Sequence, residues 1–182
     1  MKYVVISGSR NPQGQTARAV RALARGLEGL GASGQTYFLP TLKIERCRQC
    51  DDNGWGTCRS AGRCVIEDDL AKLVEEIRGA DLVIFATPVY FGDLSESFRA
   101  FTDRLRRTCM NDAGKAGINN KRAVGLCVAG GGGGGGPSCA VSMDRVLRTC
   151  GFDLVDIIPL RRQNLEGKLP SLEATGRWLG SL

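Results

Sequence analysis

An apolar run that ends in a loop and opens into a helix is the feature that most constrains the fold of this chain. Residues 81–86 are followed by Thr87-Pro88-Val89-Tyr90-Phe91-Gly92, and a helical pattern begins near Asp93. A buried strand that leads through a short loop into a helix builds a ligand site at the carboxyl edge of a parallel sheet. Residues 7–16 and the seven glycines at 130–136 lie in two further loops of this kind. Three such loops argue against a module that only binds other proteins.

Strand and helix patterns alternate along the whole sequence. Strands are expected at residues 2–7, 35–39, 81–86, 121–129 and 153–158, and helices at 15–30, 67–78, 93–105, 139–150 and 171–182. Each helix carries one apolar stripe, and Asp93 with Glu96 resembles a capping pair. The alternation predicts an α/β fold in which a five-stranded parallel sheet, ordered 2-1-3-4-5, lies between two layers of helices.

The length of 182 residues predicts a single domain, residues 1–182, with a cysteine-rich insertion at 40–66. No apolar run is long enough to cross a membrane, and the first residues form a strand pattern rather than a signal peptide. We therefore expect a cytoplasmic protein without a membrane partner. The net charge of +6 is scattered along the chain, which favours a solvated surface over nucleic-acid binding. The absence of histidine excludes histidine general bases and histidine-ligated metals.

The first loop has the composition of a phosphate site. Backbone N–H groups at the start of a helix bind phosphate dianions, and the hydroxyls of Ser9 and Thr16 add donors. Arg10 supplies a positive charge. The loop matches neither the P-loop pattern nor the dinucleotide-binding pattern of glycines, which disfavours both of those readings.

Four of the eight cysteines lie within the insertion, spaced Cys47-x2-Cys50-x7-Cys58-x5-Cys64. Four thiolates at short spacing enclose an iron–sulfur cluster or a tetrahedral zinc ion. A metal-free thiol loop, or disulfides in an oxidised preparation, are the alternatives that the residues leave open. Four arginines near these thiols would lower their pKa values and offset the charge of a cluster: Arg46, Arg48, Arg59 and Arg63. Cys127 and Cys150 are predicted to be buried small hydrophobic residues.

Three segments carry a resemblance to a known family: Ile6-Ser7-Gly8-Ser9 with Gly14-Gln15-Thr16, Thr87-Pro88-Val89-Tyr90-Phe91-Gly92, and Phe101-Thr102-Asp103-Arg104. They resemble the NADPH-dependent FMN reductase superfamily, and most closely its iron–sulfur flavoprotein branch. The resemblance covers most of the chain and implies a flavodoxin-like three-layer sandwich. The branch has a four-cysteine motif after its second strand, usually with two residues between the second and third cysteines, where this chain has seven.

The resemblance implies a non-covalent FMN, with the phosphate in the first loop, the isoalloxazine along residues 88–92 and its edge against the first glycines of 130–136. Trp55 is expected to pack on a neighbouring subunit or to cap the flavin. The expected cofactor contacts are Ser7, Ser9, Arg10, Gly14, Gln15, Thr16, Pro88, Val89, Tyr90, Phe91, Gly92, Gly130, Gly131 and Gly132. The expected ligands of a 4Fe-4S cluster are Cys47, Cys50, Cys58 and Cys64.

The sequence thus predicts an FMN-dependent NAD(P)H oxidoreductase that passes electrons from a reduced nicotinamide or carrier to an acceptor. The flavin carries the redox chemistry, so no side chain is expected to act as a catalytic acid or base. Two alternatives are an iron–sulfur flavoprotein that only carries electrons, and a zinc-bearing binding module on the same scaffold. The donor and acceptor are expected to be small molecules or proteins. A homodimer or homotetramer is expected because the long loops at 40–65 and 109–120 need to be covered.

Overall fold

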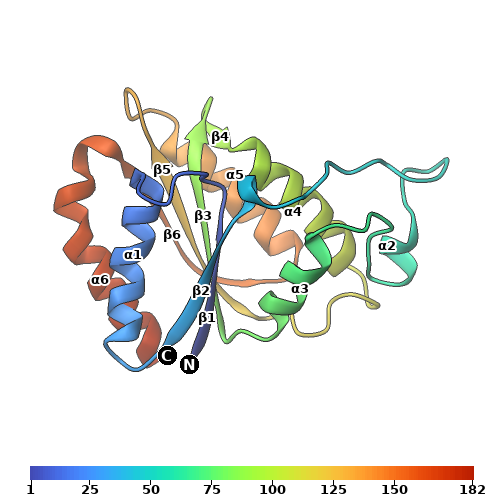
Figure 1. The fold of residues 1–182 in the computed structure, drawn as a ribbon, viewed down its shortest axis with the longest axis horizontal. Coiled ribbons are helices and arrows are strands. Elements are labelled where there is room, and N and C mark those ends of the chain that lie inside the picture. The colour runs from blue at the N-terminus through green and yellow to red at the C-terminus, as the bar shows by residue number, and fades with distance from the viewer.

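The computed structural model describes residues 1–182 and shows a parallel sheet between two layers of helices (Figure 1). The sheet has the strand order β2-β1-β3-β5-β6, and a short strand β4 pairs with β3 in the antiparallel sense. This order is that of the flavodoxin-like doubly wound fold, so the predicted fold class is confirmed. The strands are β1 (Lys2–Ser7), β2 (Ser33–Phe38), β3 (Leu82–Tyr90), β4 (Asp93–Leu94), β5 (Arg122–Ala129) and β6 (Asp153–Arg161).

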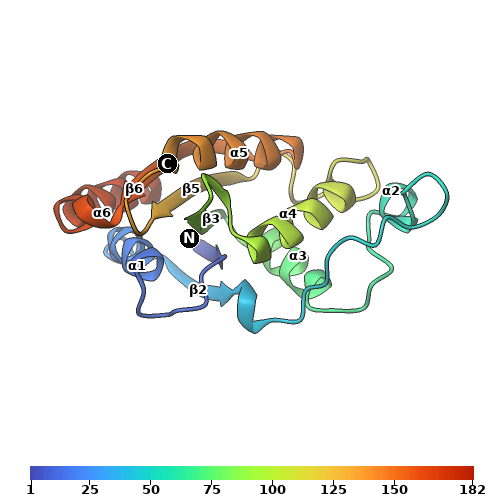
Figure 2. The ribbon, with the colours of Figure 1, turned by 90° about the horizontal axis from the view of Figure 1, so that it is seen from above.

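Helices cover both faces of the sheet, as Figure 2 shows from above. Residues of α1 and α6 pack on one face, and residues of α3, α4 and α5 pack on the other. The central strands are apolar on both faces because both are covered. The helices are α1 (Gln15–Glu28), α2 (Thr57–Ser60), α3 (Leu70–Arg78), α4 (Glu96–Cys109), α5 (Gly136–Thr149) and α6 (Leu165–Ser181), with 3-10 turns η1 (Leu39–Thr41) and η2 (Arg162–Asn164). None of the helices combines the length and the apolar character that a membrane span requires.

The insertion between β2 and α3 is the least regular part of the chain. After η1 its only helix is the single turn α2, and Figures 1 and 2 show it at the end of the molecule, beyond α4. Its attachment to the rest of the fold therefore depends on side-chain contacts rather than on strand pairing.

Three predicted boundaries are wrong around the second loop and the last helix. Residues 87–90 continue strand β3, because pairing of β3 with β5 extends to Val89 and pairing with β4 to Tyr90. Asp93 lies in β4 and does not cap a helix: its carboxylate accepts bonds from the Leu94 N–H at 2.8 Å and from Arg99 at 2.5 Å. The last helix begins at Leu165 rather than at residue 171, and it accommodates Pro170.

Candidate functional site

A cleft of about 430 Å³ opens at the carboxyl ends of β1, β3 and β5. All three loops singled out from the sequence contribute to its walls. The predicted residues that line it are Ser9, Gln15, Thr16, Pro88, Val89, Tyr90, Gly130, Gly131 and Gly132. Val128, Gly133 and Gly134 also line it and were missed, although the continuous glycine run was a signal for the last two.

Five predicted contacts do not line this cleft. The Ser7 side chain is buried, and its Oγ accepts the Ser9 N–H at 3.3 Å, so it shapes the first loop from beneath. Arg10 is exposed, and Gly14 is the N-cap residue of α1. Phe91 and Gly92 form the turn after β3, both with positive φ. These five residues are neighbours, in the sequence, of residues that line the cleft, but they do not line it themselves.

The first loop is fixed to β3 and α4 by a group of hydroxyls that sequence reasoning missed. Gly8 N–H donates to the Ala86 carbonyl at 2.8 Å, and the Ser95 and Ser97 hydroxyls donate to the Gly8 carbonyl at 3.1 and 3.2 Å. A Cβ on Gly8 would lie 2.4 Å from the Ser95 Oγ, so glycine is required by this close approach. The loop is consequently held in place before any ligand binds.

The N-terminus of α1 faces the cleft without a competing anion. Gly14 caps the helix without a side-chain hydrogen bond, and the first turn contains no acidic residue. Gln15 and Thr16 occupy the first two helical positions and line the cleft. Free N–H groups and the helix dipole make this end suited to a phosphate.

Backbone conformation explains the presence of glycine at some positions of the loop 130–136 but not at others. Gly131, Gly133 and Gly135 have positive φ, which favours glycine. Gly130, Gly132 and Gly134 have no such φ, and a Cβ on any of them would meet no atom within 4 Å. Neither strain nor internal packing therefore accounts for these three glycines, whereas a flat ligand against the backbone would.

The aromatic pair at the end of β3 is unusually open to solvent. Tyr90 is 48% exposed and Phe91 109% exposed, and Phe91 adopts a φ of 51°, which side chains other than glycine rarely adopt. Burial of these rings as ordinary core residues is thereby excluded. Both rings are free to cover a ligand or a second protein chain.

The four cysteines of the insertion line one cavity. The cavity has a volume of about 20 Å³, and no three of its thiols, nor any other three His, Cys, Asp or Glu side chains, are close enough to share one metal ion. Of the four arginines expected near the thiols only Arg48 lines the cavity, whereas Arg104 and Arg107 of α4, which were not expected, also line it. The signal for Arg104 was its place three residues after buried Phe101, on the inner face of α4.

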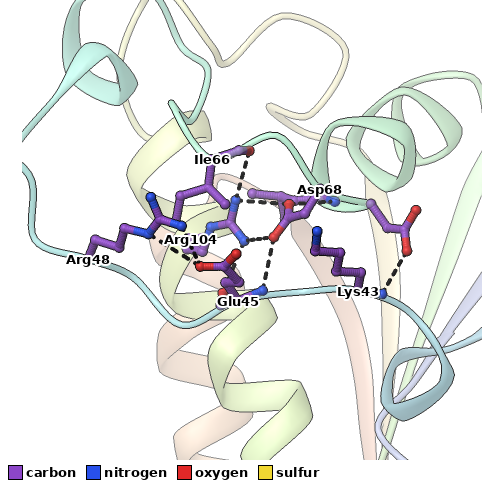
Figure 3. A network of polar contacts seen from close by, with 8 residues as sticks. Lys43, Glu45, Arg48, Ile66, Asp68 and Arg104 are labelled. Carbon is purple, nitrogen blue, oxygen red and sulfur yellow. Dashed lines mark hydrogen bonds and ion pairs between the residues drawn. The ribbon is translucent and has the colours of Figure 1, made fainter.

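A buried ion pair fastens the insertion to α4 (Figure 3). Arg104 and Asp68 have side chains that are 1% and 0% exposed, and their shortest contact is 2.5 Å. Burial opposes the ionised form of Asp68, but hydrogen bonds from Arg104 and from the N–H groups of Glu45 and Leu70 outweigh it and lower the pKa of the carboxyl. Burial opposes the charge on Arg104, but the Asp68 carboxylate and the nearby Cys64 thiol outweigh it and raise the pKa of the guanidinium.

Trp55 makes a second attachment between the insertion and α4. Its ring lies 4.6 Å from the Arg107 guanidinium and 5.8 Å from that of Arg59. Arg107 also donates to the Gly54 carbonyl at 2.7 Å. Trp55 therefore does not line the cleft of its own chain, and its contact with a neighbouring subunit stays a prediction.

The other four cysteines are buried in the core facing α4 and α5. The prediction for Cys127 and Cys150 as buried hydrophobic residues is confirmed. Burial raises the pKa of the Cys150 thiol, and contact with Cys139 raises that of Cys127. Those two thiols stay protonated, and none of the four core cysteines belongs to the cysteine cavity.

Residues 1–157 match the family described as NADPH-dependent FMN reductase. The chain belongs to this family. It is 31% identical over 106 residues to an iron–sulfur flavoprotein of Methanocaldococcus jannaschii, covering 58% of this chain and 52% of that protein. It is also 31% identical over 133 residues to an iron–sulfur flavoprotein of Methanosarcina thermophila, covering 71% of this chain and 64% of that protein.

Similarity to solved structures supports the flavodoxin-like fold of the chain. A flavodoxin from the domain Archaea superposes with a TM-score of 0.61 at 14% identity, covering 100% of this chain and 97% of the other. The curated relatives are longer: this chain spans about half the length of the first and under two thirds of the second.

Proposed function

We propose that this chain is an FMN-dependent oxidoreductase that takes reducing equivalents from NAD(P)H or a reduced carrier and passes them to an acceptor. One observation carries the proposal: Gly130, Gly132 and Gly134 line the cleft, yet nothing within the chain requires glycine at these positions. Glycine in place of alanine costs about 0.5–1 kcal/mol in chain entropy. A flat cofactor that approaches the backbone closely accounts for that cost, and FMN is the flavin named in the family description.

The first loop would hold the FMN phosphate. Thr16 and Gln15 begin α1, where unbonded N–H groups and the helix dipole favour a dianion, and Ser9 lies across the same cleft. Hydroxyl anchors on Gly8 keep this loop in position, so little ordering would be needed on binding. Ser7 and Gly14 would support the loop, and Arg10 would add charge from its rim.

The isoalloxazine would lie between residues 88–90 and the glycine loop. Pro88, Val89 and Tyr90 supply apolar surface on one side, and the backbone of residues 130–132 lies on the other. When bound, FMN supplies hydride and single-electron transfer chemistry. The residues of this chain bind and orient the ring, and none is assigned as a catalytic acid or base.

We further propose that Cys47, Cys50, Cys58 and Cys64 ligate one 4Fe-4S cluster. Their thiols line one cavity, and four thiolates can enclose either a cluster or a tetrahedral zinc ion. The iron–sulfur flavoproteins among the relatives favour the cluster. Arg48, Arg104 and Arg107 on the cavity wall would offset its negative charge. The cavity of about 20 Å³ must widen on loading, and the exposed segment 51–53 leaves room for that movement.

We propose that the chain functions as a homodimer or homotetramer. Phe91 is fully exposed in a strained turn beside the flavin cleft, and the insertion lies at the far end of the molecule (Figure 1). A second copy that covers Phe91 would account for both its exposure and its strain. We also propose the cytoplasmic location expected from the sequence, where cysteines stay reduced and available as ligands.

The test compares Gly132→Val with Gly167→Val, because a Cβ at either position meets no protein atom within 4 Å. Both variants should fold, as measured by circular dichroism of the apoprotein. Gly132→Val should weaken FMN binding at least tenfold in a fluorescence titration, whereas Gly167→Val should not. Equal FMN affinity in the two variants would remove the glycine loop from the site. Anaerobic mixing of the holoprotein with NADPH then separates an enzyme, whose flavin bleaches, from an electron carrier, whose flavin does not.

A further inference from the structure

Arg104 is a buried cation that lines the cavity of the four cysteines, and one of its N–H donors makes no hydrogen bond. Its side chain is 1% exposed. Nη1 donates to the Glu45 carbonyl at 3.0 Å and to Asp68 at 2.5 Å, and Nη2 donates to the Ile66 carbonyl at 3.4 Å and to Asp68 at 3.0 Å. These four bonds use four of the five N–H groups of a guanidinium. The fifth, on Nε, is the one buried side-chain polar atom in the chain without a partner.

An unused donor at this position is costly. A buried donor without an acceptor loses its hydration without gaining a hydrogen bond in return, and the loss is larger when the donor belongs to a charged group. The Asp68 pair does not explain the arginine either, since well-packed apolar residues stabilise a core as well as a buried ion pair does. Arg104 lines the cavity that the four thiols share, so an acceptor for the Nε–H is expected on that side of the guanidinium.

The other cationic walls of the cavity differ from Arg104. Arg48 has a 60% exposed side chain, and it already donates to Glu45 through Nε and Nη2. Arg107 is committed to the Gly54 carbonyl and to the Trp55 ring. Arg104 alone combines full burial, a rigid set of bonds and a donor left over.

We propose that Arg104 is a positioning residue for the iron–sulfur cluster, and that its Nε–H donates to a sulfur atom of the bound cluster. This inference rests on the cluster assigned to the four cysteines. A hydrogen bond and a positive charge at a sulfur stabilise the reduced, more negative state, so Arg104 raises the reduction potential. Through Asp68, Glu45 and Ile66 the same guanidinium joins both arms of the insertion to α4, which fixes the donor before iron binds.

Two variants remove the Nε donor in different ways. Arg104→Lys keeps the charge next to Asp68 but has no Nε–H. The double variant Arg104→Met, Asp68→Asn removes the charge of both partners, so no uncompensated buried ion remains, and the new side-chain amide still offers an oxygen to the Glu45 N–H. Arg48→Met is the matched control, because it removes a cation from the same cavity wall without removing a free buried donor.

The experiment reconstitutes each protein anaerobically with iron and sulfide and measures the midpoint potential of the cluster by a spectroscopic redox titration. The reduction equilibrium of both Arg104 variants should fall at least tenfold relative to wild type, which is about 59 mV for a one-electron couple. Arg48→Met should change it less than about twofold. Wild-type potentials in both Arg104 variants overturn the inference, as does an equal shift in Arg48→Met, which would indicate a general charge effect.

A second measurement covers the case in which the variants do not retain iron. Pulsed EPR of the reduced wild-type protein, grown with ¹⁵N-arginine, should show a ¹⁵N coupling to the cluster. Absence of that coupling overturns the hydrogen bond whatever the variants do. If the wild-type protein itself takes up no iron, the proposed cluster fails, and that result is distinct from failure of the Arg104 inference alone.

Discussion

The cleft at the carboxyl ends of β1, β3 and β5 and the cavity lined by the four cysteines of the insertion are built by different means. The cleft lies at the ends of paired parallel strands, and its first loop is attached to the sheet through backbone bonds such as Gly8 N–H to Ala86. The cysteine cavity lies in an insertion whose only helix after η1 is a four-residue turn, and it is attached through the side chains of Arg104 and Arg107. A site at a sheet edge inherits its geometry from the topology, whereas a site in an insertion depends on a few anchors.

The largest expected effect comes from breaking the Asp68–Arg104 ion pair, the main anchor of the insertion. Asp68→Ala leaves the buried Arg104 charge without its partner and should lower the free energy of unfolding by about 3–5 kcal/mol. Chemical denaturation measures the loss, and limited proteolysis should cut within residues 42–69 first. Asp112→Ala, which removes the exposed partner of Lys115, is the control and should cost less than about 1 kcal/mol. Equal losses in the two variants would show that the insertion has another main anchor.

The second largest expected effect comes from a substitution at the contact between α1 and α6. A Cβ on Gly26 would lie 2.1 Å from the Glu173 carbonyl oxygen, so Gly26→Ala forces α1 and α6 apart and should cost about 1–3 kcal/mol. Gly167→Ala in α6 has open space and should be neutral or stabilising in the same thermal unfolding assay. Iron uptake should stay at the wild-type level in both. A loss of iron from Gly26→Ala would mean that the two regions are coupled.

The third effect concerns FMN binding in the cleft, which should change without any change in the cysteine cavity. Thr16→Glu places a carboxylate where the phosphate is proposed, and should weaken FMN binding at least tenfold, which is about 1.4 kcal/mol. An acidic residue in the first turn is favourable to the helix dipole, but Thr16 is buried, so circular dichroism of the apoprotein must first show a native fold for the variant. Gln13→Glu, in the same loop but outside the cleft, is the control. Full retention of FMN by Thr16→Glu after dialysis would place the phosphate elsewhere.

The smallest effect near neutral pH concerns the titration of Asp68. Since its pKa is lowered in the folded protein, the stability that it contributes is fully present above the unfolded value of about 3.9 and is lost as pH falls through the folded value. Stability from this carboxyl should therefore stay constant from pH 7 to about 5 and fall only at lower pH. Asp68→Asn should remove that acid-dependent part of the unfolding curve. An unchanged acid limb would assign the loss to other carboxyls.

Much of the fold could be predicted from the sequence, because it follows from local patterns. Alternating strands and helices predicted the strand order, and the apolar run at 81–86 with the glycines at 130–136 predicted the loops that form the cleft. The wrong boundaries have a physical reason as well. Residues 87–90 resemble a loop in composition, but pairing with β5 and β4 satisfies their backbone groups and extends β3.

The sequence by itself determined the order of the sheet, the place of the cleft and the four thiols of the insertion, since periodicity, glycine content and cysteine spacing are local properties. Only the tertiary structure decided which arginines reach those thiols. Arg104, Arg106 and Arg107 are near neighbours on α4, and their chemistry is the same. Burial of Arg104 comes from Asp68 and from the carbonyls of Glu45 and Ile66, which are 36 to 59 residues away. The place of Arg104 three residues after Phe101 indicates the inner face of α4, but no local pattern identifies the distant partners that turn this charge into a buried anchor.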